Sequence, residues 1–431
     1  MAKTLSWSKG LSSILFWSII SAAFIGPGTV TTAANAGASF GIGILWALVF
    51  SILATIVLQE AAARITIASG KNLGEIIVLK FQGKGRLQWF LFLAVAFGCA
   101  AYQAGNLLGA ISGLLLFGSI SRAVATLGLA LFCFLLLWIG NYKIIARLLG
   151  IVVAFMGILF IYVATFSDYE GFEILQAAVI PQLMEGSSLL IISLIGTTIV
   201  PYNLFLASGI SQGQDVREMR LGLVIAIIIG GLISVAIMLA GTQIDGTFSF
   251  EALAETLSQR VGKWGTVFFG LGLFAAGLSS SITAPLAAAV AGQSLLGKNQ
   301  DQWKNQGRYF RMVWMGILGI GLLLALLDVK PIPAIILAQA INGALLPIIA
   351  IFLFMVANDR QILGAQFVNN WFSNSFTLLI VGLSCFIGLN NFCKALARTF
   401  SFDLGTTYLW WLMAVCFLIV ILLFYKVLYR R

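Results

Sequence analysis

The sequence predicts an all-α integral membrane protein that crosses the bilayer about twelve times. Its 431 residues are 60% hydrophobic and only 9% charged, whereas soluble proteins are about 45–50% apolar and about 25% charged. A hydrocarbon layer of about 30 Å requires about 20 helical residues per crossing. Each crossing must be helical, because an irregular backbone facing lipid would leave its amide groups unpaired.

Twelve apolar segments are long enough to serve as spans. They lie near residues 12–36, 41–68, 88–117, 122–140, 145–166, 187–211, 221–243, 265–297, 311–327, 332–357, 373–390 and 405–428. A thirteenth segment, residues 248–261, has helical spacing with one apolar face and is predicted to lie along the outer membrane surface. The Trp and Tyr residues of the last two spans are typical of interfacial anchors.

The net charge of +10 is interpreted as a topology signal. If the N-terminus is cytoplasmic and the loops alternate, 19 of the 25 Lys and Arg residues lie on the cytoplasmic side, as the positive-inside rule requires. The other six are Arg122, Arg260, Lys263, Lys330, Lys394 and Arg398. We therefore expect both termini in the cytoplasm and a location in the cytoplasmic (inner or plasma) membrane. The cations flank spans and form no single patch, so no nucleic-acid partner is expected.

The residue types needed for several kinds of chemistry are scarce. The chain has no histidine, and its five cysteines are scattered without a close pair, so neither a metal cluster nor a disulfide framework is indicated. No nucleotide-binding loop of the G-x-x-x-x-G-K-S/T kind is present. We expect neither an enzyme nor a bound cofactor; the lipid bilayer and a small solute or cation are the expected partners.

Two of the spans are interrupted by proline near their middles. Span 1 carries Pro27 between two glycines and span 6 carries Pro201, and an internal proline removes a helix hydrogen bond. The two interruptions open successive sets of five spans, which is the sequence signature of an inverted-repeat transporter with its site at the broken helices. The expected organisation is a single membrane domain with three parts: spans 1–5 in 1–166, spans 6–10 in 187–357, and two further spans in 373–431.

The chain resembles the Nramp family (natural-resistance-associated macrophage proteins) over roughly spans 1 to 10. The resemblance is carried by AFIGPGTVTTAANAGASFGIGILWALV, LQEAAARITIASGKNLGE, GTTIVPYNLFLAS, SSSITAPLAAAVAGQ and LAQAINGALLP. It implies a LeuT-like fold with a 5+5 inverted repeat and broken helices 1 and 6. It also implies a proton-coupled transporter of divalent metal ions that works by alternating access.

The positions that match the family's metal ligands are not metal ligands here. The family's Asp-Pro-Gly-Asn in span 1 corresponds to Gly26 and Thr29, and its Met-Pro-His in span 6 corresponds to Val200 and Tyr202. The family's proton-relay positions are likewise neutral here, at Gln103, Asn106 and Ala207. The resemblance thus identifies the place of the site, while the residues lack its carboxylate, its thioether and its titratable groups.

The expected solute site is neutral and lies where the two broken spans meet. Its predicted residues are Gly26, Pro27, Gly28, Thr29, Thr197, Val200, Pro201, Tyr202, Asn203 and Gln339. Thr29, Asn203 and Gln339 are the available, weak oxygen donors to a metal. Such donors favour a hydrated hard cation such as Mg²⁺ over manganese or iron. A small neutral, zwitterionic or anionic organic solute is the alternative, as is a transport-dead sensor on the same scaffold.

Two other sets of polar residues lie within the predicted spans. Glu60 and Arg64 share a face of span 2 at i,i+4 and form either a structural ion pair or a gate or pH-sensing pair. Span 8 carries hydroxyls that serve either a sodium site or, as we favour, helix packing. These hydroxyls belong to Ser279, Ser280, Ser281 and Thr283. The substrate, the coupling ion, the direction of transport and the oligomeric state do not follow from the sequence.

Overall fold

The computed structural model describes residues 25–81, 85–140, 143–297, 301–304, 306–327, 329–400, 405 and 407–428. These residues form helices and no strand, as predicted. Eleven candidate spans lie within them, with the span Ser188–Ile210 interrupted near its middle. Of the predicted first span, 12–36, residues 12–24 lie outside the described residues.

The helices follow the predicted apolar segments closely. Up to residue 166 the described chain contains α2 (Pro27–Phe40), α3 (Leu45–Ser69), α4 (Leu73–Lys80), α5 (Gly85–Leu115), α6 (Arg122–Ile139) and α7 (Lys143–Ala164). After α8 (Gly171–Val179) come α9 (Ser188–Thr198), α10 (Pro201–Ile210), α11 (Val216–Gly241), α12 (Phe250–Val261), α13 (Trp264–Leu296), η1 (Asp301–Trp303), α14 (Arg308–Leu326) and α15 (Pro331–Ala357). The chain continues with α16 (Arg360–Leu363), α17 (Trp371–Phe400) and α18 (Tyr408–Leu428).

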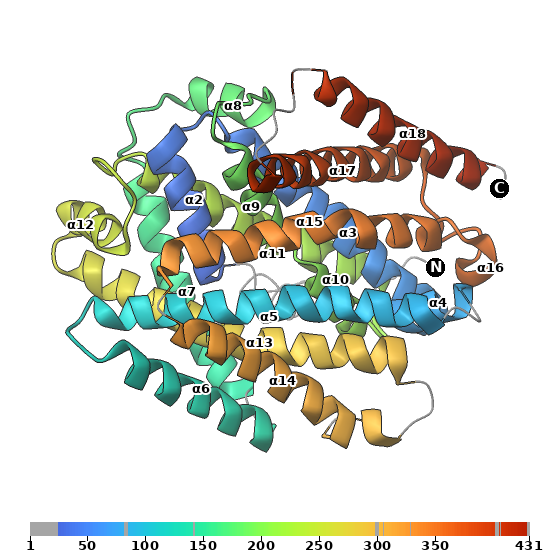
Figure 1. Cartoon of the computed structure of the whole chain (residues 1–431), viewed down its shortest axis with the longest axis horizontal. Coiled ribbons are helices and arrows are strands. Elements are labelled where there is room, and N and C mark those ends of the chain that lie inside the picture. The colour runs from blue at the N-terminus through green and yellow to red at the C-terminus, as the bar shows by residue number, and fades with distance from the viewer. Residues whose placement is uncertain are drawn as a thin grey trace.

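The interrupted span is at the centre of the molecule. In the most apolar stretch of this span 89% of the residues are buried, whereas in α18 only 11% are. The pair α9–α10 packs against α3 and α15, while α5 and α13 form the most extensive contact between helices. Figure 1 shows α17 and α18 along one side of the bundle and α6 and α14 along the other. The outer helices therefore present apolar residues to lipid and leave the centre for a polar site.

Glycines let α2 and α11 cross at backbone distance, as small residues do in membrane proteins. A Cβ atom at Gly37 would lie 2.1 Å from the Met238 carbonyl oxygen, and one at Gly241 would lie 2.2 Å from the Ala34 carbonyl oxygen. Gly41, just beyond α2, has a φ of 56°, which suits glycine and few other residues.

We expect Gly241→Ala to destabilise the protein because its methyl group would meet a backbone atom that cannot move independently. Overpacking of this kind costs about 1–3 kcal/mol or more. Gly316→Ala in α14 is the matched control, since a Cβ there meets nothing within 4 Å. Thermal unfolding of both detergent-solubilised variants provides the measurement. Equal melting temperatures would contradict the close crossing of α2 and α11.

Candidate functional site at the broken helices

The chain leaves the helical conformation between α9 and α10. Ile199 has φ −95° and ψ 79°, and Val200 has φ −85° and ψ 121°. Proline disfavours the helical region for the residue before it and brings no N–H of its own, so Pro201 starts a new helix. The interruption predicted in span 6 is confirmed.

The other half-helix of the site also begins at a proline. Gly26 caps α2 with φ −101° and ψ 176°, and Pro27 occupies the first helical position. Proline is well suited to this position because its missing N–H would have no intrahelical partner. Both α2 and α10 thus begin at the cavity that Gly28, Thr29 and Tyr202 line, and turn the positive end of their helix dipole toward it.

A small cavity lies between these half-helices. Its volume is about 10 Å³, close to the minimum of about 10–15 Å³ that one water molecule requires. It is lined by Gly26, Gly28, Thr29, Tyr102, Asn106, Thr197, Tyr202 and Ser280. The hydroxyls of Thr29 and Thr197 lie 3.0 Å apart, so the start of α2 and the end of α9 are joined by a hydrogen bond beside the cavity.

Five of the ten predicted solute-site residues line this cavity, and Asn106 joins them from the former proton-relay set. Val200, Pro201 and Asn203 are buried but lie outside the lining. Neither Asn203 Oδ1 nor Nδ2 has a hydrogen-bond partner among the described residues, and orphaned buried polar groups of this kind usually indicate an unseen partner such as water. The Pro27 ring packs against Gly109 of α5, where a Cβ atom would lie 2.1 Å from Pro27 Cβ.

Gln339 is the other predicted residue outside the lining, yet it touches the broken backbone. A Cβ atom at Gly28 would lie 1.9 Å from Gln339 Nε2, so the amide occupies the space that glycine leaves. The Gln339 Oε1 atom is buried without a hydrogen-bond partner in the described part of the chain. The Gln339 Oε1 atom can therefore accept a hydrogen bond from a solute bound next to the start of α2.

Besides Asn106, two cavity residues were not among the predicted solute ligands, Tyr102 and Ser280. The hydroxyl of Tyr102 donates to the Gly196 carbonyl oxygen at 2.8 Å, and its ring meets that of Tyr202 edge-on at 5.8 Å and 89°. Gly196 belongs to the last turn of α9, where the break removes helical partners from carbonyl groups. Tyr102 stands one turn before Asn106 on α5, and this i,i+4 spacing is the signal that would have found it.

Ser280 is the span-8 hydroxyl that reaches the cavity. A Cβ atom at Gly26 would lie 3.1 Å from its Oγ. The Thr283 hydroxyl instead donates to the Ser279 carbonyl within α13 at 2.6 Å. Gln103 Nε2 donates to the carbonyl of Ser281 at 3.2 Å, which joins α5 to α13 away from the cavity. The sodium and packing interpretations of these hydroxyls both stay predictions.

The cavity contains neutral polar groups only. None of its lining residues is acidic or basic, and the part of the chain that the structure describes holds no group of three or more Cys, Asp or Glu residues placed to bind a metal ion. Ala207, the third former relay position, is fully buried in an apolar cluster of α3, α10 and α11. What the cavity offers a solute is hydroxyl and amide groups.

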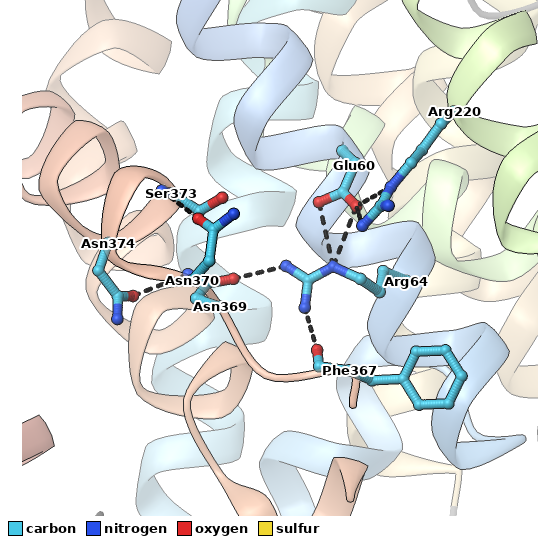
Figure 2. Close-up of polar contacts among 8 residues, drawn as sticks. All are labelled: Glu60, Arg64, Arg220, Phe367, Asn369, Asn370, Ser373 and Asn374. Atoms are coloured by element: carbon cyan, nitrogen blue, oxygen red, sulfur yellow. Dashed lines mark hydrogen bonds and ion pairs between the residues drawn. The ribbon is translucent and has the colours of Figure 1, made fainter. Parts of the chain in front are cut away.

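The charged residues of the region do not line the cavity: Glu60 and Arg64 lie in the later part of α3, and Arg220 lies in the first turns of α11 (Figure 2). Arg64 Nε donates to both carboxylate oxygens of Glu60, at 3.0 and 3.2 Å, so the predicted ion pair is present. Arg220 of α11 approaches Glu60 Oε1 at 2.8 Å. The remaining Arg64 nitrogens donate to the Phe367 carbonyl and to Asn369 Oδ1.

A second set of contacts continues this network. Asn358 and Asn374 exchange two side-chain hydrogen bonds of 2.8 Å, which join the end of α15 to α17. Lys80 at the end of α4 lies 2.9 Å from Asp359. Burial alone would raise the pKa of Asp359, but hydrogen bonding and charge from Lys80, with two backbone N–H groups, lower that pKa below its ordinary value.

The fold, the break between α9 and α10 and the start of α2 at Pro27 define a class: multi-span membrane transporters built on the LeuT-like fold. The sequence profile described as "Natural resistance-associated macrophage protein-like" matches residues 18–394. The chain belongs to the Nramp family.

Similar proteins agree with this assignment. The chain is 29% identical over 290 residues to a divalent metal cation transporter MntH of Erwinia tasmaniensis, covering 63% of this chain and 70% of the relative. It is 26% identical over 364 residues to the divalent metal cation transporter MntH of Klebsiella pneumoniae, covering 81% of this chain and 86% of the relative. A manganese transporter of Eremococcus coleocola, in its H236A mutant form, superimposes with a TM-score of 0.73 at 19% identity, covering 100% of this chain and 96% of that one. This last likeness shows the fold.

Proposed function

We propose that the protein is a secondary transporter whose substrate is a hydrated hard divalent cation, with magnesium as the leading candidate. The observation that carries the proposal is a cavity of neutral hydroxyl and amide groups at the meeting point of two half-helices. Relatives named as divalent metal cation transporters support the cation class. The LeuT-like fold supports alternating access as the mechanism, with the broken spans changing which side of the membrane reaches the cavity.

The donor set argues against a dehydrated manganese or ferrous ion. A bare dication in a low-dielectric site requires an anionic or soft ligand, because an unpaired buried charge is very costly. Thr29, Thr197 and Ser280 offer hydroxyl oxygens alone, and Tyr102 already donates to the Gly196 carbonyl at the end of α9. Mg²⁺ retains several of its waters in proteins, so neutral oxygens can bind its hydration shell. The proposal therefore requires that the cavity, about 10 Å³ in this structure, widens as the half-helices move.

One observation favours an organic solute as the second candidate. Asn106 lines the cavity, and its buried Nδ2 group has no hydrogen-bond acceptor among the described residues. An N–H donor cannot bind a cation. Together with the N-terminal ends of α2 and α10, which attract negative charge, it suits a carbonyl or carboxylate group. The substrate would then be a small neutral, zwitterionic or anionic molecule.

We assign the transport machinery to two inverted repeats, 1–166 and 187–357, with residues 373–431 outside them. The proposed membrane is the cytoplasmic one, with both termini in the cytoplasm. A larger cavity of about 630 Å³ lies between the later parts of α10 and α13 and is lined in part by Asn72, Gln212, Gln293 and Lys304. Under this orientation it is the cytoplasmic mouth of the pathway.

Uptake by reconstituted vesicles tests the proposal. Vesicles should accumulate magnesium saturably and manganese poorly, with empty vesicles as the control. Saturable uptake of an amino acid or another small organic molecule, without magnesium uptake, would establish the second candidate. Ligand-dependent thermal stabilisation without any uptake would instead show a transport-dead sensor.

We expect transport without coupled proton movement. Gln103 and Asn106 are amides and Ala207 is a methyl group, so the positions of the family's relay carry no group that titrates near neutral pH. A pH-sensitive dye inside vesicles should report no acidification during substrate uptake, with an ionophore added afterwards as the positive control. Substrate-dependent acidification would contradict this expectation and direct attention to Glu60.

A further inference from the structure

One carboxylate at the cytoplasmic ends of α3 and α11 is shared by two guanidinium groups. The Arg64 side chain is 5% exposed, the Glu60 side chain 17% and the Arg220 side chain 53%. Burying charges is costly unless their hydrogen-bonding capacity is met. Here each oxygen of Glu60 accepts from Arg64, and Arg64 finds two further acceptors at Phe367 and Asn369. A buried charge met by partners from separate elements links those elements strongly.

An apolar seam lies beside this network. The seam is the buried apolar cluster where α3, α10 and α11 meet. It consists of Ala63 of α3, Ala207 of α10, and Met219, Leu223, Ala226 and Ile227 of α11. Ala207 is 0% exposed and lies on the same short helix as Tyr202, which lines the central cavity. Opening this seam would therefore move the helix that carries a wall of the cavity.

α3 and α10 are joined to each other as well. The hydroxyls of Thr66 and Ser208 lie 2.6 Å apart, and Ser208 Oγ also accepts from the backbone N–H of Leu73 at 2.6 Å. These bonds make α3 and α10 a unit on the cytoplasmic side. Arg64 attaches that unit to the segment before α17, and Glu60 attaches it to α11. Figure 2 shows Arg64 lying between these two attachments.

We propose that Glu60, Arg64 and Arg220 form a cytoplasmic latch, which holds the α3–α10 unit against α11 and against the start of α17 and releases when the cytoplasmic side opens. The proposal gives α17, which lies outside the two repeats, a role as a restraint on the moving helices. It rests on the alternating access and the orientation proposed above, and it holds whatever solute the cavity binds.

Cysteine accessibility tests the latch without any substrate. The reporter is the full-length chain with its five cysteines replaced by alanine and with Ala207→Cys added, in membrane vesicles that expose the cytoplasmic side. The rate of labelling by a membrane-impermeant maleimide measures how often the seam opens. We expect Glu60→Gln and Arg220→Gln each to raise that rate at least about fivefold, the lower end of typical conformational couplings.

Two controls separate a latch from a simple loss of stability. Arg217→Gln removes an exposed cation from the same end of α11 and should leave the labelling rate unchanged. A second reporter retains only native Cys133, which is buried in a different apolar cluster; its labelling should be unaffected by Glu60→Gln. Faster labelling of both reporters would show general loosening and would overturn the proposal.

The decisive negative result is an unchanged labelling rate at position 207 in folded Glu60→Gln and Arg220→Gln proteins. A lower melting temperature with that unchanged rate would show that the network is structural only. Arg64→Gln leaves a buried carboxylate with one partner fewer and risks misfolding, so the half-exposed Arg220 and the amide variant of Glu60 decide the outcome. Asn369→Ala, which removes one attachment to the α17 side, should also accelerate labelling.

Discussion

Gly26→Asp is expected to create a divalent-cation site of higher affinity than the neutral site that we propose for the wild-type protein. The substitution places a carboxylate at the cap of α2, beside the hydroxyls of Thr29 and Thr197. The attraction between two unit charges 4 Å apart is about 4 kcal/mol at an effective dielectric constant of about 20, and a dication doubles it. After desolvation we expect manganese and magnesium to bind at least about tenfold more tightly, or about 1.4 kcal/mol.

The backbone at Gly26 accepts a side chain. Its φ of −101° and ψ of 176° lie in the region that all L residues adopt. The nearest atom to a Cβ is Ser280 Oγ at 3.1 Å, and a hydroxyl on a rotatable side chain is able to move by a few tenths of an ångström. The aspartate would thus enter the cavity without rebuilding it.

Gly26→Asn is the matched control for this substitution, because it has nearly the same shape and no charge. Titration calorimetry on both purified variants and the wild type measures the three affinities. Asp should bind divalent ions and Asn should not. Equal affinities in folded Asp and Asn variants would show that position 26 does not face the ion, and micromolar manganese binding by the wild type would contradict the neutral-site interpretation itself.

The architecture was largely predictable, because span positions depend on local composition. Lipid admits little besides helices, and a proline ends a helix by its own covalent structure. The start of α10 at Pro201 therefore follows from the residues near it. The first half of the first span lies outside the described residues, so that part of the expectation stays a prediction.

The membership of the cavity was less predictable, because it depends on helix rotation. Successive residues of an α-helix point about 100° apart, so Tyr202 faces the cavity while Asn203 turns elsewhere. Tyr102 and Ser280 come from other helices, and local composition does not tell which face of α5 or α13 meets the broken spans. Arg220 was missed as the partner of Glu60 for a similar reason: 160 residues separate them.

Gly28→Ala is expected to impair solute binding while sparing the fold. Its methyl group would lie 1.9 Å from Gln339 Nε2 and 2.5 Å from Gln339 Cδ, so the two cannot coexist. The displaced atoms are the far end of a flexible side chain, which turns away more easily than backbone does. The amide would leave the start of α2. Its Oε1, which has no hydrogen-bond partner among the described residues, would no longer be available to a bound solute or its waters.

Gln339→Ala is the companion variant, and the two substitutions form a double-mutant cycle. Each single substitution should weaken binding of the transported solute by about tenfold, close to the value of one hydrogen bond. The double variant should bind no more weakly than Gln339→Ala alone, because the added methyl group then has no amide to displace. Additive losses would mean that Gly28 acts through the backbone and not through Gln339. Similar melting temperatures in all four proteins would place the effect at the site, since a lost fold would lower binding and stability together.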